Sequence, residues 1–114
     1  MTLSTTEPTN SPANWVKGPA LATVANNTVY LLEDDRDGIA IVNFEGEFTA
    51  FQNACLHQGL PIHAGYLDGD GVLLCPWHNW CYDVRNGDCL TAPGAGLEQF
   101  AVRVEAGHIW VGKA

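Results

Sequence analysis

The most informative segments of this sequence are Cys55-Leu56-His57-Gln58-Gly59-Leu60-Pro61 and Cys75-Pro76-Trp77-His78. Each segment supplies one thiol and one imidazole, and seventeen residues separate His57 from Cys75. A Cys₂His₂ zinc finger instead has both cysteines on one arm and both histidines on the other. Because each arm here is mixed, each arm can give its cysteine to one metal atom and its histidine to a second. A [2Fe–2S] cluster in which two histidines replace two cysteines on one iron requires this arrangement.

At these residues the chain resembles the Rieske family, whose signature is C-x-H, a spacer of comparable length, and then C-x-x-H. The next segment, Tyr82-Asp83-Val84-Arg85-Asn86-Gly87, resembles the hairpin that follows the second ligand loop in this family. Thr91-Ala92-Pro93-Gly94 resembles the proline-containing loop that covers the cluster. The resemblance runs from about Trp15 to Val111, which is most of the chain.

The resemblance implies one [2Fe–2S] cluster of Rieske type and assigns its ligands. Cys55 and Cys75 would bind the inner iron as thiolates, and His57 and His78 would bind the outer iron at the exposed tip. The resemblance also implies that Pro93 shields the cluster from water and that Tyr82 is the family's tyrosine. Trp77 and Trp80 flank the second loop and are interpreted as packing of the cluster unit, with contact between an exposed Trp77 and a partner as the alternative.

Two features of high-potential relatives are missing from this chain. The disulfide-bearing members carry an extra cysteine in each ligand loop, where this chain has Leu60 and Trp77. High-potential relatives also have a serine that bonds a bridging sulfide, and the aligned residue here is Trp80, although Tyr82 matches the family's tyrosine. We therefore expect a midpoint potential toward the low end of the Rieske range, which runs from about −150 to about +300 mV.

Two further cysteines, Cys81 and Cys89, flank the Asn86-Gly87 pair. They would not lie directly opposite each other in a two-residue hairpin. We interpret them as reduced thiols rather than as a disulfide. Of the other histidines, His63 is interpreted as a solvated loop residue, with the rim of a docking surface as the alternative, and His108 as a surface residue.

Size and composition are those of one globular domain. The chain has 114 residues, of which 46% are apolar, and no apolar run approaches the roughly 20 residues of a membrane-spanning helix. We expect residues 1–14, rich in Ser, Thr and Pro, to form a flexible tail and residues 15–114 to form a single domain. The N-terminus has neither a basic start nor an apolar centre, so we expect a cytoplasmic protein.

The net charge of the chain argues against one class of partner, nucleic acid. Five basic and thirteen acidic residues give a net charge of −8, which disfavours nucleic acid because phosphate contacts need a clustered basic face. Two accounts of the acidity stay open. It can simply keep a small protein soluble, or it can steer the protein toward a basic patch on a redox partner.

Hydrophobic alternation and turn residues, with no sustained helical spacing, predict an all-β fold. The resemblance makes it a Rieske-like antiparallel β-sandwich base with a small cluster-binding subdomain of two ligand loops at about residues 53–82, and a covering loop near residues 91–95. Two-residue turns are expected at Glu45-Gly46, Asn86-Gly87 and Ala106-Gly107. Trp15 and Trp110 are expected in the core of the base. The predicted strands are Thr28–Leu32, Ile39–Phe44, Glu47–Gln52, Val72–Cys75, Cys81–Val84, Cys89–Leu90, Gln99–Glu105 and His108–Val111.

Three functional interpretations follow. The first is a monomeric electron carrier, itself no enzyme, that takes one electron from a flavin reductase and passes it to a terminal ring-hydroxylating oxygenase, as the resemblance implies. The second is a small electron-transfer subunit of a larger oxidoreductase, such as a nitrite reductase. The third is a structural zinc module, because zinc also accepts two cysteines and two histidines.

Overall fold

A computed structural model of the chain describes residues 5–6, 14–33, 38–56, 61–75 and 80–113. The described part is built from strands and two single-turn 3₁₀ helices, which confirms the all-β prediction. The strands are β1 (Thr5–Thr6), β2 (Asn14–Ala20), β3 (Thr28–Leu32), β4 (Ile39–Phe44), β5 (Glu47–Gln52), β6 (Tyr66–Leu67), β7 (Val72–Leu74), β8 (Cys81–Asp83), β9 (Gln99–Glu105) and β10 (His108–Lys113). The helices are η1 (Leu21–Thr23) and η2 (Ile62–Ala64).

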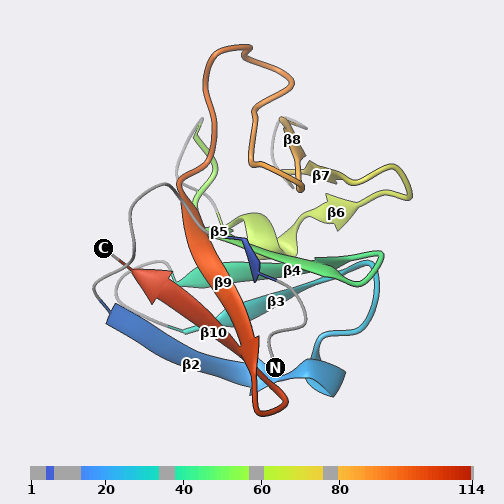
Figure 1. The fold of residues 1–114 in the computed structure, drawn as a ribbon. Helices are drawn as coiled ribbons and strands as arrows, with labels where there is room; N and C mark the ends of the chain where they lie inside the picture. The colour runs from blue at the N-terminus through green and yellow to red at the C-terminus, as the bar shows by residue number, and fades with distance from the viewer. Residues whose placement is uncertain (1–4, 7–13, 34–37, 57–60, 76–79, 114) are drawn as a thin grey trace.

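The strands form a large base sheet and a small second sheet (Figure 1). The base has the order β2-β10-β9-β5-β4-β3, with β1 also paired to β9, and the small sheet has the order β6-β7-β8. All of these pairings are antiparallel. The base sheet folds over on itself. A Cβ built at Gly18 of β2 would lie 3.5 Å from the side chain of Ile41 in β4, so the two halves of the base face each other as in a sandwich.

Strands β4 and β5 lie between two separate hydrophobic cores. Ile39 and Ile41 of β4 belong to the core inside the base, whereas Ala40 and Val42 belong to the core beneath the small sheet. Since successive side chains of a strand point to opposite faces, a strand buried on both faces is expected to be apolar at most positions. All six residues of β4 are buried, which explains its nearly continuous apolar sequence.

Two of the predicted two-residue turns are confirmed. Glu45 and Gly46 both take positive φ angles, 54° and 88°, and so do Ala106 and Gly107, at 50° and 78°. Positive φ at both central residues is the geometry of a type I′ turn, whose twist matches that of a hairpin. These turns fix the register of β4 on β5 and of β9 on β10.

The prediction of a two-residue turn at Asn86-Gly87 is wrong. Gly87 has a φ of 82°, but Asn86 does not adopt positive φ. The carbonyl of Asp83 accepts the N–H of Gly87 at 2.7 Å, and the N–H of Asp83 donates to Asp88 O at 2.9 Å, so the loop holds four residues. The predicted strand Cys89–Leu90 is also wrong, because the structure has only isolated bridges at Asp88 and Cys89.

The N-terminal region contributes more structure than the sequence predicts. Strand β1, at Thr5–Thr6, lies within the predicted tail and pairs with Val102 and Arg103 of β9. Strand β5 pairs with β9 only at Gln99 and Phe100, so the later residues of β9 are available to pair with β1. Strand β2 was not predicted, because its Lys, Gly and Pro interrupt the alternation of apolar side chains. An edge strand with a register shift tolerates such residues.

Trp15 and Trp110 are not core residues, contrary to the prediction. Ile109 and Val111 point into the base core, so Trp110 between them points outward. Trp15 and Trp110 are half-buried and line a surface pocket with Arg103, whose guanidinium lies 4.2 Å from the centre of the Trp15 ring.

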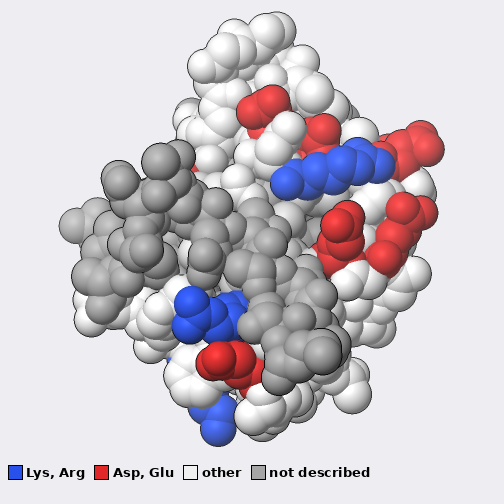
Figure 2. Space-filling view, viewed as in Figure 1, with Lys and Arg blue, Asp and Glu red and all other residues white. Residues whose placement is uncertain are grey.

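The surface is acidic at the connections between strands. Figure 2 shows acidic side chains along the right-hand side of the molecule, where the β4–β5 and β6–β7 connections lie in Figure 1. The sequence places Glu45, Glu47, Asp68 and Asp70 at or beside these turns. Neither helix in the described part of the chain has the length and apolarity needed to cross a membrane.

Candidate metal centre

Cys55 and Cys75 come from different strands and meet in one buried cluster. Cys55 follows β5, and Cys75 follows β7 directly. Their exposed fractions are 3% and 1%, and both belong to the hydrophobic core beneath the small sheet. The structure describes all four cysteines as thiols rather than disulfides, which confirms that interpretation for Cys81 and Cys89. Two thiols from separate loops in one buried site fit the thiolate half of the predicted centre.

Tyr82 is the polar residue that orients the first ligand loop. Its ring is fully buried, and its hydroxyl oxygen lies 3.1 Å from Cys55 Sγ and 3.0 Å from Leu56 N. The Leu56 N–H can only donate, so it donates to the hydroxyl oxygen. A Cys55 thiolate that binds iron has no proton, so in the loaded centre the O–H would be the donor to the sulfur. A donor at this place stabilises negative charge on the sulfur.

Burial of the ring raises the pKa of Tyr82 above its ordinary value, and the hydrogen bond to Cys55 raises it further. The N–H of Leu56 acts in the opposite direction, but burial dominates. The hydroxyl therefore keeps its proton at physiological pH and remains a hydrogen-bond donor to the sulfur of Cys55.

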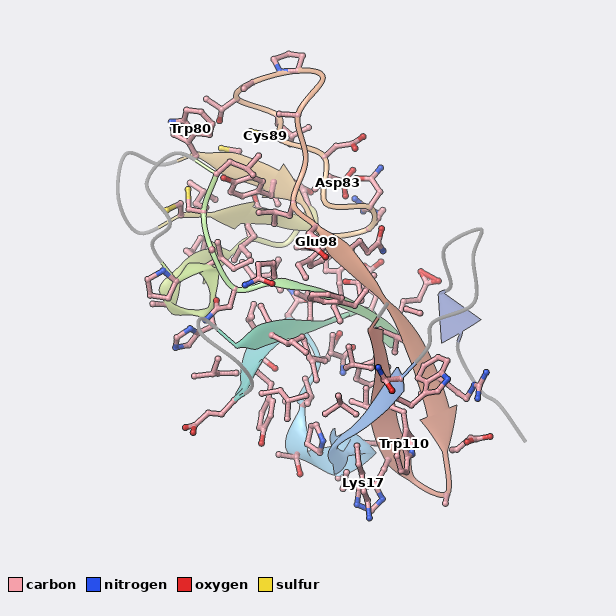
Figure 3. All side chains as sticks on the ribbon, turned by 90° about the vertical axis from the view of Figure 1, so that its left-hand side faces the viewer. Lys17, Trp80, Asp83, Cys89, Glu98 and Trp110 are labelled. Carbon is pink, nitrogen blue, oxygen red and sulfur yellow. The ribbon has the colours of Figure 1, made fainter. Side chains whose placement is uncertain are left out.

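The second ligand loop is closed by its own backbone. The N–H of Cys75 donates to the carbonyl of Trp80 at 2.8 Å, and the neighbouring pair Leu74 and Cys81 belongs to the β7–β8 ladder. Trp80 is half-buried and packs against the core that contains Cys55 and Cys75. Figure 3 shows Trp80 and Cys89 at one end of the molecule and Lys17 and Trp110 at the other.

The predicted covering loop is tied to the second ligand loop through a hydroxyl group. Thr91 Oγ1 accepts the N–H of Cys81 at 2.9 Å, and the N–H of Ala92 donates to Cys89 Sγ at 3.3 Å. Ala92 packs against the buried core, whereas Pro93 is exposed. The resemblance singled out Pro93, but the described contacts of this loop are made by Thr91 and Ala92.

A buried amide lies at the start of the first ligand loop, which the sequence analysis missed. Asn53 is 1% exposed and forms two hydrogen bonds with His63, one to its ring and one to its backbone. The interpretation of His63 as a solvated loop residue is therefore wrong, because it is half-buried and hydrogen-bonded. Nothing in the local pattern pairs these two residues, since their contact depends on how η2 packs.

The structure thus gathers Cys55, Cys75, Trp80 and Tyr82 around one buried core, and leaves Pro93 outside it. The other predicted site residues, His57, Trp77 and His78, lie outside the described residues. Among the described residues alone, no group of three metal-ligating side chains is assembled. What the structure describes is the cysteine half of the predicted ligand set, with its hydrogen-bond donor.

The comparison with protein families agrees with this geometry. A family model described as the Rieske [2Fe-2S] domain matches residues 14–101, most of the chain. This chain belongs to the Rieske family. The expected fold class and resemblance are thereby confirmed, and the family implies one Rieske-type [2Fe–2S] cluster. Two buried thiols with a phenol donor suit such a cluster, and the zinc interpretation is replaced by the iron–sulfur one.

Curated relatives include oxygenase ferredoxins and longer proteins. The ferredoxin component of an alkene monooxygenase system from Xanthobacter autotrophicus is 34% identical over 74 residues, covering 65% of this chain and 61% of that protein. Apoptosis-inducing factor 3 from Homo sapiens is 31% identical over 112 residues, covering 96% of this chain and 18% of that protein. The chain therefore spans less than two thirds of the length of either relative.

Solved structures of carbazole 1,9a-dioxygenase components share the fold. One chain from a complex of reduced oxygenase and oxidized ferredoxin in carbazole 1,9a-dioxygenase superimposes with a TM-score of 0.79 at 26% identity, covering 86% of this chain and 92% of that chain. The ferredoxin of carbazole 1,9a-dioxygenase from Nocardioides aromaticivorans gives a TM-score of 0.78 at 20% identity, covering 90% of this chain and 100% of that chain.

Proposed function

We propose that this chain is a one-electron carrier whose [2Fe–2S] cluster is held by Cys55 and Cys75 on one iron and by His57 and His78 on the other. The observation that carries the proposal is the pair of buried thiols, delivered by two separate loops to one core with the Tyr82 hydroxyl directed at one of them. A bound Rieske cluster supplies reversible one-electron chemistry. The role of the chain is to hold it, to orient it and to exclude water, so we propose a carrier and not an enzyme.

The cysteine-bearing end also suits transient docking. Leu56, next to Cys55, is 44% exposed, and Leu90, at the start of the covering segment, is 51% exposed. Exposed apolar side chains beside a redox centre can contact a partner protein. Such a contact has no ion pairs to break when the partner dissociates. We propose that a flavin reductase and a terminal oxygenase dock at this end. The named role of relatives as ferredoxin components of oxygenase systems supports the oxygenase part of this proposal.

The alternative role is an electron-transfer unit inside a larger oxidoreductase, such as a nitrite reductase. It is favoured by the match to apoptosis-inducing factor 3, in which a region of this kind makes up 18% of the protein. The two roles differ in whether the chain is stably bound to a larger polypeptide. A free carrier elutes alone when the tagged protein is purified from its natural host, whereas a subunit elutes in fixed stoichiometry with a larger polypeptide.

We propose further that the midpoint potential lies at the low end of the Rieske range. Hydrogen bonds to the sulfur atoms raise the potential of such clusters. This chain has the tyrosine donor but has Trp80 in the place of the serine donor. A midpoint above about +100 mV, in the upper half of the range, would overturn this part of the proposal.

The cytoplasm is the compartment that we propose for the protein. Four cysteines that are present as thiols, none of them in a disulfide, fit a reducing environment. Fractionation of the natural host tests this, and recovery of the protein from an oxidising compartment would contradict it.

The ligand assignment is tested by metal analysis of single variants. Wild-type protein prepared without oxygen is expected to contain about two irons and two labile sulfides per chain, with a reduced-state EPR signal of low average g. His57→Ala or His78→Ala should lose or convert this signal, because each removes one ligand of the outer iron.

The matched controls for these variants are Cys81→Ser and Cys89→Ser, which change the two cysteines outside the ligand set. Both should keep the cluster and its EPR signal. Loss of the signal in Cys81→Ser, or its retention in His78→Ala, would show that the ligands are assigned wrongly. A colourless wild-type protein with one zinc per chain would overturn the carrier proposal itself.

A further inference from the structure

Asn53 and His63 close the first ligand loop at its base. Asn53 is the first residue after β5, and His63 is the central residue of η2. The backbone N–H of His63 donates to Asn53 Oδ1 at 2.9 Å, and Asn53 Nδ2 lies 2.9 Å from His63 Nδ1. The loop that carries Cys55 begins and ends at this pair.

The backbone contact fixes the direction of the side-chain contact. A peptide N–H can only donate, so the atom of Asn53 that faces it is the carbonyl oxygen, and the other atom of the amide is the NH₂ group. That group can only donate to His63 Nδ1. Nδ1 must therefore be without a proton, and the neutral ring must carry its proton on Nε2.

Both partners are anchored to the base. The N–H of Asn53 donates to Gly38 O at 3.1 Å, and Asn53 itself is almost completely buried. Ile62, next to His63, is fully buried in the core that contains Cys55 and Cys75, and Gly65 N–H donates to Ile62 O at 2.9 Å. The pair is thus a fixed point beneath the ligand loop.

We propose that Asn53 positions the first ligand loop through a neutral His63 ring, so that cluster retention depends on the acceptor at His63 Nδ1. Cys55 lies two residues beyond Asn53, and the Tyr82 hydroxyl lies within hydrogen-bond distance of both Cys55 Sγ and Leu56 N. The start of the loop therefore has two sets of hydrogen-bonded contacts, one at Asn53 and one at Cys55 and Leu56. This inference rests on the proposed assignment of Cys55 as a cluster ligand.

Acid should open this pair. A protonated ring carries an N–H on Nδ1, which would face the NH₂ group of Asn53, and two donors repel. The amide cannot rotate to offer its oxygen, because that oxygen holds the His63 backbone.

The surroundings of His63 supply few competing charges among the described residues. The titratable side chain of β3, which packs against η2, is Tyr30, and it packs against the base core, while Glu33 follows β3 on the exposed surface. Strand β7, whose Leu74 carbonyl approaches Gly65, carries no titratable side chain, and Cys75 follows it.

The test compares two substitutions of His63, measured by the rate at which the visible absorption of the cluster is lost in the presence of an iron chelator. His63→Gln keeps an acceptor for the Asn53 amide and cannot be protonated, whereas His63→Leu removes the acceptor. At about pH 8, His63→Leu should lose its cluster about fivefold faster than wild type, the effect of one neutral hydrogen bond, while His63→Gln should match wild type.

The pH profile separates this role from simple packing. As the pH is lowered from about 8 to about 5, the wild-type rate should rise more steeply than that of His63→Gln, because only the wild-type ring can gain a proton on Nδ1. His108→Gln, at the β9–β10 end far from the ligand loops, is the matched control and should follow wild type. Far-UV circular dichroism recorded alongside checks that all variants are folded.

Equal rates and equal pH profiles for wild type, His63→Gln and His63→Leu would overturn the inference while leaving the carrier proposal intact. A His63→Gln protein as labile as His63→Leu at about pH 8 would also overturn it, because the acceptor would then be irrelevant. A wild-type protein that holds no cluster would instead overturn the ligand assignment on which the inference depends.

Discussion

Tyr82 shows how one buried hydroxyl can serve two atoms of a ligand loop. It accepts the N–H of Leu56 and lies within hydrogen-bond distance of Cys55 Sγ, 27 residues away along the chain. The sequence resemblance identifies the tyrosine, but the atoms that its hydroxyl contacts depend on how β8 packs beneath the first loop. The chemistry of the site therefore depends on a contact that spacing alone cannot reveal.

Tyr82→Phe should lower the midpoint potential. The O–H donor stabilises the more negative, reduced state, and losing about 1 kcal/mol of that preference corresponds to about 40 mV for a one-electron couple. Protein-film voltammetry measures the shift directly. Tyr66→Phe is the control, because Tyr66 is 68% exposed on β6 and should leave the potential unchanged. Equal midpoints for wild type and Tyr82→Phe would show that the hydroxyl does not act on the cluster.

The midpoint should also fall with pH in alkali. If His57 and His78 bind the outer iron, their rings would release their outer protons more readily in the oxidised state, which is the more positive one, and the reduced state would be disfavoured as pH rises. The slope can approach about 59 mV per pH unit for each proton coupled to the electron. Burial raises the pKa of Tyr82, so its hydroxyl is not the source. A flat midpoint up to strongly alkaline pH would argue against solvent-accessible histidine ligands.

At the scale of elements, side-chain alternation was sufficient where strands are buried on one or both faces. The bounds of β3, β4, β5 and β9 agree with the prediction, because apolar and β-branched residues fill these strands. Strand β2 could not be predicted in this way, since an edge strand is held by main-chain pairing to β10 rather than by an apolar face. The Asn86-Gly87 loop differs from the two-residue expectation because the close approach of Phe51 to Gly87 adds a tertiary constraint that the turn residues do not encode.

Gly87→Ala should destabilise the fold more than Gly46→Ala does. Both glycines have positive φ, 82° and 88°, which costs an L-residue about 1 kcal/mol or more. A Cβ at Gly87 would also lie 2.8 Å from the ring of Phe51, whereas a Cβ at Gly46 meets nothing within 4 Å. Overpacking of this kind typically costs a further 1–3 kcal/mol or so.

Thermal unfolding followed by far-UV circular dichroism measures the difference between these two variants. Gly46→Ala should lower Tm by about 4 °C, and Gly87→Ala by at least about twice as much. Equal Tm values for the two variants would show that the contact between the added Cβ at position 87 and the Phe51 ring does not destabilise the folded protein.

At the scale of the molecule, two cores share one pair of strands. The base core lies inside the curved sheet, and the second core, which contains Cys55 and Cys75, lies between β4–β5 and the small sheet. The family resemblance predicted this division into a base and a cluster-binding unit, and the strand pattern alone did not. The partition into a tail at residues 1–14 and a domain at residues 15–114 stays a prediction, with β1 already paired to β9 inside that tail.

A free carrier of this kind should be monomeric in solution. Its net charge of −8 makes identical surfaces repel at low ionic strength. Sedimentation velocity of the cluster-loaded protein should therefore give the mass of a single 114-residue chain. A stable dimer at micromolar concentration would favour the alternative, in which the chain works inside an assembly.

The most direct test of mixed ligation is pulsed EPR of the reduced protein after labelling its histidines with ¹⁵N. If His57 and His78 bind the outer iron, the spectrum will show hyperfine coupling to two strongly coupled ring nitrogens that changes with the isotope. A reduced cluster with no isotope-sensitive nitrogen coupling would mean that sulfur alone holds both irons, and it would contradict the account.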